Sequence, residues 1–405
     1  MKALKNYFDK IRPLFEEGGK YHWLHSVFDG FETFLFVPNT TSKSGVHIHD
    51  SRDSKRTMII VVVALIPALL FGMYNVGLQH YMAIGQEVGF WTRFFYGFLA
   101  VLPQIVVSYV VGLGIEFTAA QMKGEEIAEG FLVTGLLIPM ILPVDTPLWM
   151  IAVATAFAVI FAKEVFGGTG YNIFNVALIA RAFLFFAYPS KMSGDKVFIR
   201  TGSALGMGRP EMVNGIAQTI DGFSGATPLG QLAITDAPHF ASFTFTGVTG
   251  QPLTLSDMFW GFIPGSVGEV STFAILLGAI LLISTEVGSW KTMLSVFLGG
   301  LFAISIVNLF AVNPVMEMPA HYHFLLGGFA FGAVFMATDP VTSARTEKGK
   351  WIHGFLIGLL AITIRVFNPG YPEGMMLAIL LMNAFAPLID FYVVDANIKR
   401  RLKRV

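Results

Sequence analysis

Ten apolar segments, each about long enough to cross a bilayer, constrain this chain more than any other feature. They lie near residues 57–75, 95–117, 127–143, 148–165, 172–188, 268–285, 292–312, 321–338, 351–367 and 374–394. A helix needs about 20 apolar residues to cross a hydrocarbon core roughly 30 Å thick. Only 13% of the residues are charged, against about 25% in soluble domains. The sequence therefore predicts an all-α polytopic membrane protein with about ten transmembrane helices.

Lysine and arginine gather beside alternate ends of these segments. They precede 57–75, follow 95–117 and 321–338, and crowd residues 399–404, whereas Arg93 and Arg365 are exceptions. The alternate short loops carry none: 144–147, 313–320 and 368–373. Because basic loops stay inside, we expect both termini in the cytoplasm and the long hydrophilic loop 189–267 outside. In a Gram-negative inner membrane, that loop would be periplasmic.

The spacing of the segments divides the chain into five parts. We expect a cytoplasmic segment 1–56, five spans in 57–188, the external loop 189–267, five spans in 268–394 and a basic tail 395–405. Since each half has an odd number of spans, the two halves would be inverted relative to one another. The apolar spacing within residues 4–15 also predicts a short helix, which either lies on the membrane or docks on a partner.

A glycine-rich stretch, Ala162–Asn175, joins the fourth and fifth spans. Gly167 and Gly168 leave the backbone little restricted, and Thr169, Asn172 and Asn175 follow them. Exposed N–H groups at a helix start favour an anion or a polar ring edge, so the stretch is a candidate cofactor cradle. A tight turn between two helices needs the same glycines, and spacing alone favours that simpler interpretation.

Ionisable residues inside spans are costly and are therefore functional candidates. Arg181 falls within span five and requires a partner or a phosphate-like anion. Asp339 and Asp390 lie near the ends of spans eight and ten, where they either bind a hard cation such as Na⁺ or cap helix ends. Glu116 and Glu164 are expected at span ends, in interfacial water.

Several cofactor and partner classes are excluded by composition. The chain has no cysteine, which excludes cysteine-held iron–sulfur clusters and thioether-attached haem. The histidine spacing predicts no metal site. A net charge of zero provides no basic field for nucleic acid.

The external loop contains an unusual run at residues 221–230, Asp-Gly-Phe-Ser-Gly-Ala-Thr-Pro-Leu-Gly. Thr227 precedes a proline and is therefore biased to an extended backbone, and the nearby glycines leave its hydroxyl unshielded. An enzyme could reach that hydroxyl to modify it. The same residues also suit an ordinary turn, and the pattern favours neither interpretation.

At these residues the sequence resembles one family of membrane proteins, found in Na⁺-translocating NADH:quinone oxidoreductases (as their B subunit) and in Rnf electron-transport complexes (as their D subunit). The resemblance covers nearly the whole chain and rests on Ser224–Thr227, Lys163–Asn175, Arg181–Pro189 and Ala337–Thr342. Residues 1–56 resemble the sodium-pumping complex more than Rnf.

The resemblance implies a multisubunit pump with several cofactors. FMN would be joined to Thr227 by a phosphoester, with Ser224, Gly225 and Ala226 recognised by the attaching enzyme. Riboflavin, ubiquinone and Na⁺ would also bind. The candidate residues for the flavins are Gly167, Gly168, Thr169, Asn172, Asn175 and Arg181. Those for quinone are Gly130 and Phe131, and those for the sodium pathway are Asp339 and Asp390.

Electrons would come from NADH oxidised on a partner, because no Gly-x-Gly-x-x-Gly signature is present in a soluble domain of this chain. The implied partners are the A, C, D, E and F subunits of a six-subunit complex, together with membrane lipid, in a bacterial inner membrane. The alternatives are a component of an Rnf-type ferredoxin:NAD⁺ oxidoreductase and a cation transporter without redox chemistry.

Overall fold

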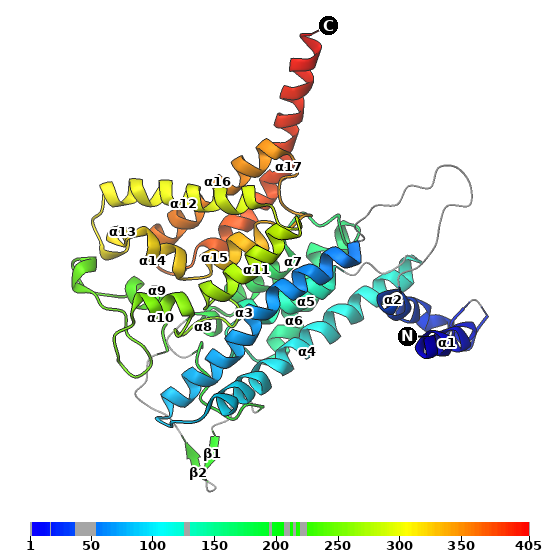
Figure 1. The fold of residues 1–405 in the computed structure, drawn as a ribbon, viewed down its shortest axis with the longest axis horizontal. Coiled ribbons are helices and arrows are strands. Elements are labelled where there is room, and N and C mark those ends of the chain that lie inside the picture. The colour runs from blue at the N-terminus through cyan, green and yellow to red at the C-terminus, as the bar shows by residue number, and fades with distance from the viewer. Residues whose placement is uncertain are drawn as a thin grey trace.

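The computed structural model of the chain is a bundle of membrane helices (Figure 1). It describes residues 2–16, 18–36, 54–124, 130–193, 197–205, 211–213, 216–218 and 225–404. Within these residues, six helices are long and apolar enough to cross a membrane. They are α3 (Ser54–Ala83), α4 (Phe90–Lys123), α6 (Leu148–Ala162) extended by η3 (Glu164–Phe166), α12 (Trp290–Leu309), α16 (Glu347–Phe367) and α17 (Met375–Leu402).

The other four expected spans are shorter or broken. The structure therefore does not have the ten complete transmembrane helices that the sequence predicts. Spans three, five and six form α5 (Phe131–Ile141), α7 (Val176–Ala187) and α11 (Thr272–Ser284). At 1.5 Å per residue, each is only about 16–20 Å long. Span eight is divided into α14 (Ala320–Leu325), α15 (Phe329–Phe331) and the π-helical turn η5 (Gly332–Met336). The interruption falls at Gly327 and Gly328, whose φ angles are +68° and +67°.

Extended backbone beside the short helices obtains its hydrogen bonds from polar side chains inside the long ones. Gln104 of α4 donates to the Val144 carbonyl at 2.7 Å, and Asn75 of α3 donates to the Ile263 carbonyl at 2.8 Å. Non-helical backbone at membrane depth is tolerated only where such partners exist. These buried amides therefore allow the short helices to end inside the bundle.

The break in span eight is held from both sides by opposite charges. Arg365 of α16 donates to the carbonyls of His323 and Leu326, at 2.6 and 3.1 Å, at the C-terminal end of α14. On the other side, a Cβ added to Gly328 would lie 2.7 Å from the Glu269 carboxylate, where α15 begins. A cation at a helix C-terminus and an anion at an N-terminus are both stabilising.

The long helices pack through small residues. The sequence Gly354-Phe-Leu-Ile-Gly358 places two glycines of α16 against α12. A Cβ at Gly358 would overlap the Val296 carbonyl oxygen. Small residues four apart let two membrane helices approach this closely. The helices α3 and α4 also lie side by side, as the blue and cyan ribbons of Figure 1 show.

The N-terminal helices form a small aromatic cluster. The helix α1 (Lys2–Ile11) and the turns η1 (Arg12–Leu14) and η2 (His22–Leu24) lead into α2 (His25–Leu35). The rings of Phe8 and Phe15 lie 5.6 and 4.6 Å from that of Phe28. The apolar side of the first helix therefore contacts its own chain, through α2.

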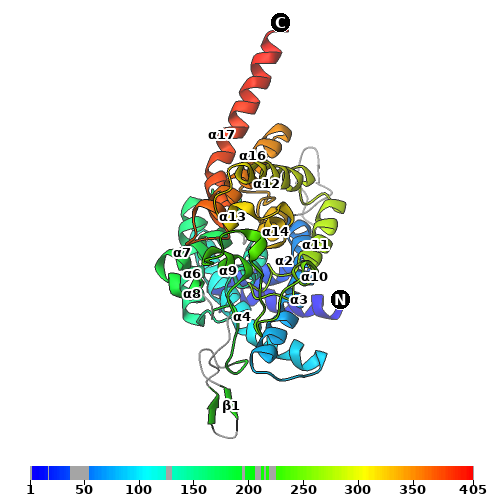
Figure 2. The same cartoon turned by 90° about the vertical axis from the view of Figure 1, so that its left-hand side faces the viewer.

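The segment between the halves contains only short elements among its described residues. They are α8 (Pro189–Met192), the antiparallel strands β1 (Glu211–Val213) and β2 (Ile216–Gln218), α9 (Pro228–Ala233), η4 (Phe240–Ser242) and α10 (Leu255–Trp260). A further turn, α13 (Pro314–Glu317), precedes span eight. In Figure 2, the β-hairpin and the C-terminal end of α17 project at opposite ends of the molecule.

Candidate functional site

Two cavities lie along the short helix α7. Its cap Asn175 and first residue Val176 line one of them, and Arg181 and Phe185 line the other. The rise from Asn175 to Phe185 is about 15 Å. We call them the hairpin cavity and the Thr227 cavity.

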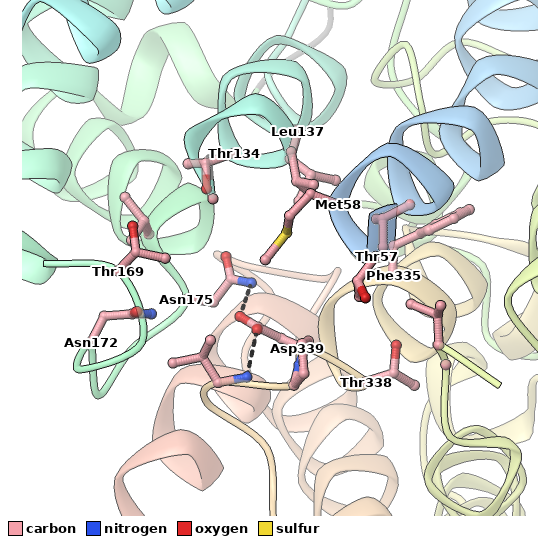
Figure 3. Close-up of a pocket in the computed structure, with 18 of the residues that line it drawn as sticks. Thr57, Met58, Thr134, Leu137, Thr169, Asn172, Asn175, Phe335, Thr338 and Asp339 are labelled. Atoms are coloured by element: carbon pink, nitrogen blue, oxygen red, sulfur yellow. Dashed lines mark hydrogen bonds between the residues drawn. The ribbon is translucent and has the colours of Figure 1, made fainter. Parts of the chain in front are cut away.

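The hairpin cavity has a volume of about 780 Å³ including its mouth, and residues from both halves of the chain line it (Figure 3). Its wall combines amides, hydroxyls and two charged groups with apolar side chains. The polar members are Thr57, Thr134, Lys163, Thr169, Asn172, Asn175, Thr338 and Asp339, and the apolar ones include Met58, Leu137 and Phe335. Such a wall suits a flat ligand with a hydrogen-bonding edge.

A hydrogen-bond network joins the two halves at this cavity (Figure 3). The Asn175 amide oxygen accepts from the Leu178 N–H at 3.2 Å, and its nitrogen donates to Asp339 at 3.2 Å. The Asp339 carboxylate also accepts from the Val341 N–H at 3.0 Å and the Thr342 hydroxyl at 3.1 Å. Asp339 is therefore fixed by three donors.

The glycines of the hairpin give the cavity its shape through the backbone. Gly167, Gly168 and Gly170 have φ angles of +116°, +97° and +94°, a region that residues other than glycine rarely adopt. They bring Thr169 so close to Gly130 that a Cβ at Gly130 would lie 2.7 Å from the threonine methyl. Gly130 and Thr169 line the cavity, whereas Gly167 and Gly168 do not.

A buried ion pair lies behind the same cavity. The Lys163 ammonium contacts the Glu116 carboxylate, and both side chains are 5% exposed. The expectation of interfacial water around Glu116 was therefore wrong. The glycine hairpin places Lys163 against α4. The lysine side chain there covers the Glu116 carboxylate and supplies its countercharge.

The Thr227 cavity lies toward the other end of α7 and has a volume of about 930 Å³ including its mouth. Thr227 is the N-cap of α9, and its hydroxyl oxygen accepts from the Gly230 N–H at 3.2 Å. Aromatic side chains form part of the wall: Phe185 and Tyr371, with ring centroids 4.6 Å apart, and Phe198. Ala226 also lines this cavity.

Arg181 has two carboxylate partners beside the Thr227 cavity. One guanidinium nitrogen donates to Glu269 at 2.6 Å and another donates to Glu373. The three side chains are 6%, 9% and 13% exposed. Arg181 therefore has the partner that its position required, and both of its outer nitrogens are already engaged.

The structure separates some of the residues that the sequence singled out. Phe131 is fully buried and packs on Gly112, so it does not line the cavity that Gly130 lines. Asp390 lies at neither cavity and instead caps the start of α16, accepting from the Arg345 and Thr346 N–H groups at 2.7 and 3.0 Å. Gly225 is buried beside Ala226, and Ser224 lies outside the described residues.

Sequence reasoning missed Glu269, Glu373, Tyr371 and Phe185. The two glutamates lie at the edges of expected spans, where an isolated acid is ordinarily assigned to water. The signal that could have found them is Arg181 itself, because a buried guanidinium requires countercharge. No pattern in the sequence marks the two aromatic residues as lining a cavity.

Known proteins are similar to this sequence over almost the whole chain. The model of the NQR2, RnfD, RnfE family matches residues 41–399. The chain is 42% identical, over 99% of its length, to the B subunit of the Na(+)-translocating NADH-quinone reductase of Chromohalobacter salexigens, of which it covers 97%. Proteins of the same name from Haemophilus influenzae (strain PittEE) and Pseudomonas aeruginosa (strain LESB58) are 42% and 41% identical, each with 99% of both chains covered.

Proposed function

The chain belongs to the NQR2, RnfD, RnfE family, and we propose that it is the B subunit of a Na⁺-translocating NADH-quinone reductase. The proposal is supported by relatives of that name that match almost the whole chain at 41–42% identity. In this function, electrons from NADH oxidised on a partner subunit pass through this membrane protein to ubiquinone, coupled to Na⁺ export. The A, C, D, E and F subunits would form the complex around it.

The two halves of the bundle are proposed to be inverted repeats. Three pairs of packed elements in the first half have a counterpart in the second half. The pairs α4–α6, α6–α7 and α5–α7 correspond, in that order, to α12–α16, α16–α17 and η5–α17. The α3–α4 pair has no equally close counterpart in α11 and α12. The short span three and the broken span eight occupy equivalent positions, and such pairs commonly form binding sites in inverted-repeat proteins.

Both termini are proposed to lie in the cytoplasm, with residues 189–267 on the outer side. The lysines at span ends support this orientation, because basic residues near span ends favour the cytoplasmic side. Lys123, the last residue of α4, contacts Glu164 after α6 at 2.8 Å, and Lys291 in the first turn of α12 contacts Glu347 at the start of α16. The hairpin cavity would then open toward the cytoplasm and the Thr227 cavity would lie toward the outside.

Thr227 is proposed to carry FMN through a phosphoester on its hydroxyl oxygen. The residues around it fit this group: the hydroxyl borders a cavity, and Phe185, Phe198 and Tyr371 offer flat apolar surfaces for a ring system. When bound, the flavin supplies the electron-accepting chemistry that a cysteine-free chain lacks. The chain itself would hold the ring against aromatic walls, and Glu373 fixes the Arg181 guanidinium that lines the same cavity.

The hairpin cavity is proposed to hold riboflavin, with quinone nearby at Gly130. Asn172, Thr169 and Asn175 provide donors and acceptors for a polar ring edge, and Met58, Leu137 and Phe335 provide apolar contact. Asp339, fixed by three donors, would orient the Asn175 amide toward the ligand. Asp339 and Asp390 remain the proposed acids of the sodium pathway.

The observation that carries the cofactor assignment is the position of Thr227 on the wall of an aromatic cavity. The test is in-gel flavin fluorescence of the denatured chain after maturation in its native host. Thr227→Ala should abolish the fluorescence, whereas Thr235→Ala, a change at another threonine near α9, should retain it. Fluorescence that persists in Thr227→Ala would show that the attachment lies elsewhere.

A further inference from the structure

A groove lies between the first turns of α16 and the C-terminal half of α17, away from both cavities. Its walls combine two cations, one phenol and one amide with an apolar floor. The residues are Lys348, Ile352, Ile389, Tyr392, Val393, Ala396, Asn397 and Arg400, and none of them is acidic. The groove therefore offers positive charge beside apolar surface.

The two cations converge because their helices run in opposite directions. Thr346, which caps α16, contacts Asp390 of α17, and Arg365 near the end of α16 contacts Glu373 just before α17, so the two helices are antiparallel. Side chains lean toward the N-terminus of their own helix. The Lys348 side chain therefore leans toward the C-terminal end of α17, and the Arg400 side chain leans in the opposite direction, toward Lys348.

These cations are free to bind an anion, unlike two of their neighbours. Lys350 and Lys399 form ion pairs with Glu347 and Asp395, both at 2.6 Å. Among the described residues, no carboxylate lies within ion-pair distance of Lys348 or Arg400. Asn397 accepts a hydrogen bond of 2.7 Å from Arg400, which orients the guanidinium and leaves its other donors available.

The length of α17 is consistent with a groove at the depth of the lipid headgroups. The helix α17 has 28 residues, or about 42 Å, which exceeds the roughly 30 Å hydrocarbon core. Figure 1 shows its last turns standing beyond the bundle. Tyr392 is 62% exposed, and tyrosine is enriched at the boundary between membrane and water.

We propose that this groove binds one anionic phospholipid. The phosphodiester contacts Lys348 and Arg400, the Tyr392 hydroxyl donates to the headgroup, and an acyl chain lies along Ile352, Ile389 and Val393. Basic pockets between membrane helices are typical sites for such headgroups. The occupant is a lipid because exposed apolar side chains continue from the groove along the two helices, such as Ile352, Phe385 and Leu388.

The test measures lipid retained by the purified complex in detergent, by native mass spectrometry, after titration with phosphatidylglycerol or with uncharged phosphatidylcholine. Wild type should bind one phosphatidylglycerol in preference to phosphatidylcholine. The double variant Lys348→Gln/Arg400→Gln should weaken that binding about 10- to 30-fold, from roughly fivefold per cation. The matched control Lys399→Gln/Arg401→Gln removes the same charge outside the groove and should bind as wild type does.

Three results would overturn the proposal. Equal binding of the two lipids would show that the groove does not recognise charge. An equal loss of phosphatidylglycerol binding in the control variant would show that the effect comes from general surface charge and not from the groove. Loss of a partner subunit from the groove variant, with phosphatidylglycerol binding unchanged, would assign the surface to a protein.

Discussion

Asn175 and Asp339 are 164 residues apart in the chain, yet the amide of one donates to the carboxylate of the other at 3.2 Å. The same amide caps α7 through its oxygen. One side chain thus fixes the start of a helix in the first half and the orientation of an acid in the second. A change at Asp339 should therefore alter the wall of the hairpin cavity from both sides.

Replacing Asp339 should destabilise the protein and loosen the non-covalent flavin. Asp339→Ala leaves three donors without their acceptor, and an unsatisfied buried donor costs about 1–3 kcal/mol. We expect a loss of about 2–4 kcal/mol in unfolding free energy and a smaller loss in Asp339→Asn. The control Asp395→Ala, which removes only the pair with Lys399, should cost less than about 1 kcal/mol. Thermal unfolding and riboflavin content per complex measure both effects. Wild-type stability in Asp339→Ala would contradict the network's role.

Replacing Arg181 alone should lower the stability of the protein more than replacing Arg181 together with Glu269 and Glu373. Arg181→Gln leaves Glu269 and Glu373 buried without countercharge, and breaking such a pair typically costs about 3–5 kcal/mol. The triple variant with Glu269→Gln and Glu373→Gln should recover most of that loss. The yield of monodisperse protein and its thermal midpoint report the result. Failure of the triple variant to recover stability would show that charge imbalance is not the cause.

Asp390 gives a prediction in which capping and ion transport can be separated. Asp390→Ala should weaken the sodium dependence of quinone reduction more than it lowers flavin content. It should also cost about 1–2 kcal/mol through the lost cap of α16. Thr346→Ala removes another part of that cap without removing an acid, so it is the control. A sodium response equal to wild type in Asp390→Ala would exclude this acid from the pathway.

The contact of α13 with the loop at residues 239–243 should depend on pH. Hydrogen bonds from His239 and from the Phe240 N–H lower the pKa of Glu317 below its usual 4.5. A lowered folded-state pKa means that the contact stabilises the fold above the ordinary glutamate pKa and is lost as pH falls through the lowered value. In wild type, hydrogen exchange at Phe240 should accelerate as the pH falls below the ordinary glutamate pKa of 4.5 and through the lowered value. In Glu317→Gln it should show no such step.

The sequence was sufficient to locate the apolar segments but not to show which of them are short or interrupted. Hydropathy placed span three through Pro143 and span six from Gly268, whereas α5 ends at Ile141 and α11 begins at Thr272. The sign that a helix ends inside the bundle is a polar side chain on a neighbouring helix, such as Gln104 or Asn75. The carbonyl group that this side chain contacts is known only from the folded structure. The break at Gly327 and Gly328 was visible as a glycine pair, although its supporting charges were not.

The grouping of candidate residues could be predicted best within one short stretch of sequence, and their binding roles stay a prediction. The hairpin residues Thr169, Asn172 and Asn175 do line one cavity together, and Asp339 joins them. Arg181 was grouped with that hairpin as a flavin candidate but lines the Thr227 cavity instead. The rise of the helix explains the difference, because Arg181 lies six residues, or about 9 Å, beyond Asn175 along α7.

The short helix α7 has a mechanical consequence. Val176–Ala187 contains neither glycine nor proline, so it lacks the residues at which helices usually bend. Both cavities share it as a wall, and their spacing is therefore set by a stiff rod. A shift of α7 along its axis would therefore change both cavities at once, and would leave the distance between their shared walls unchanged.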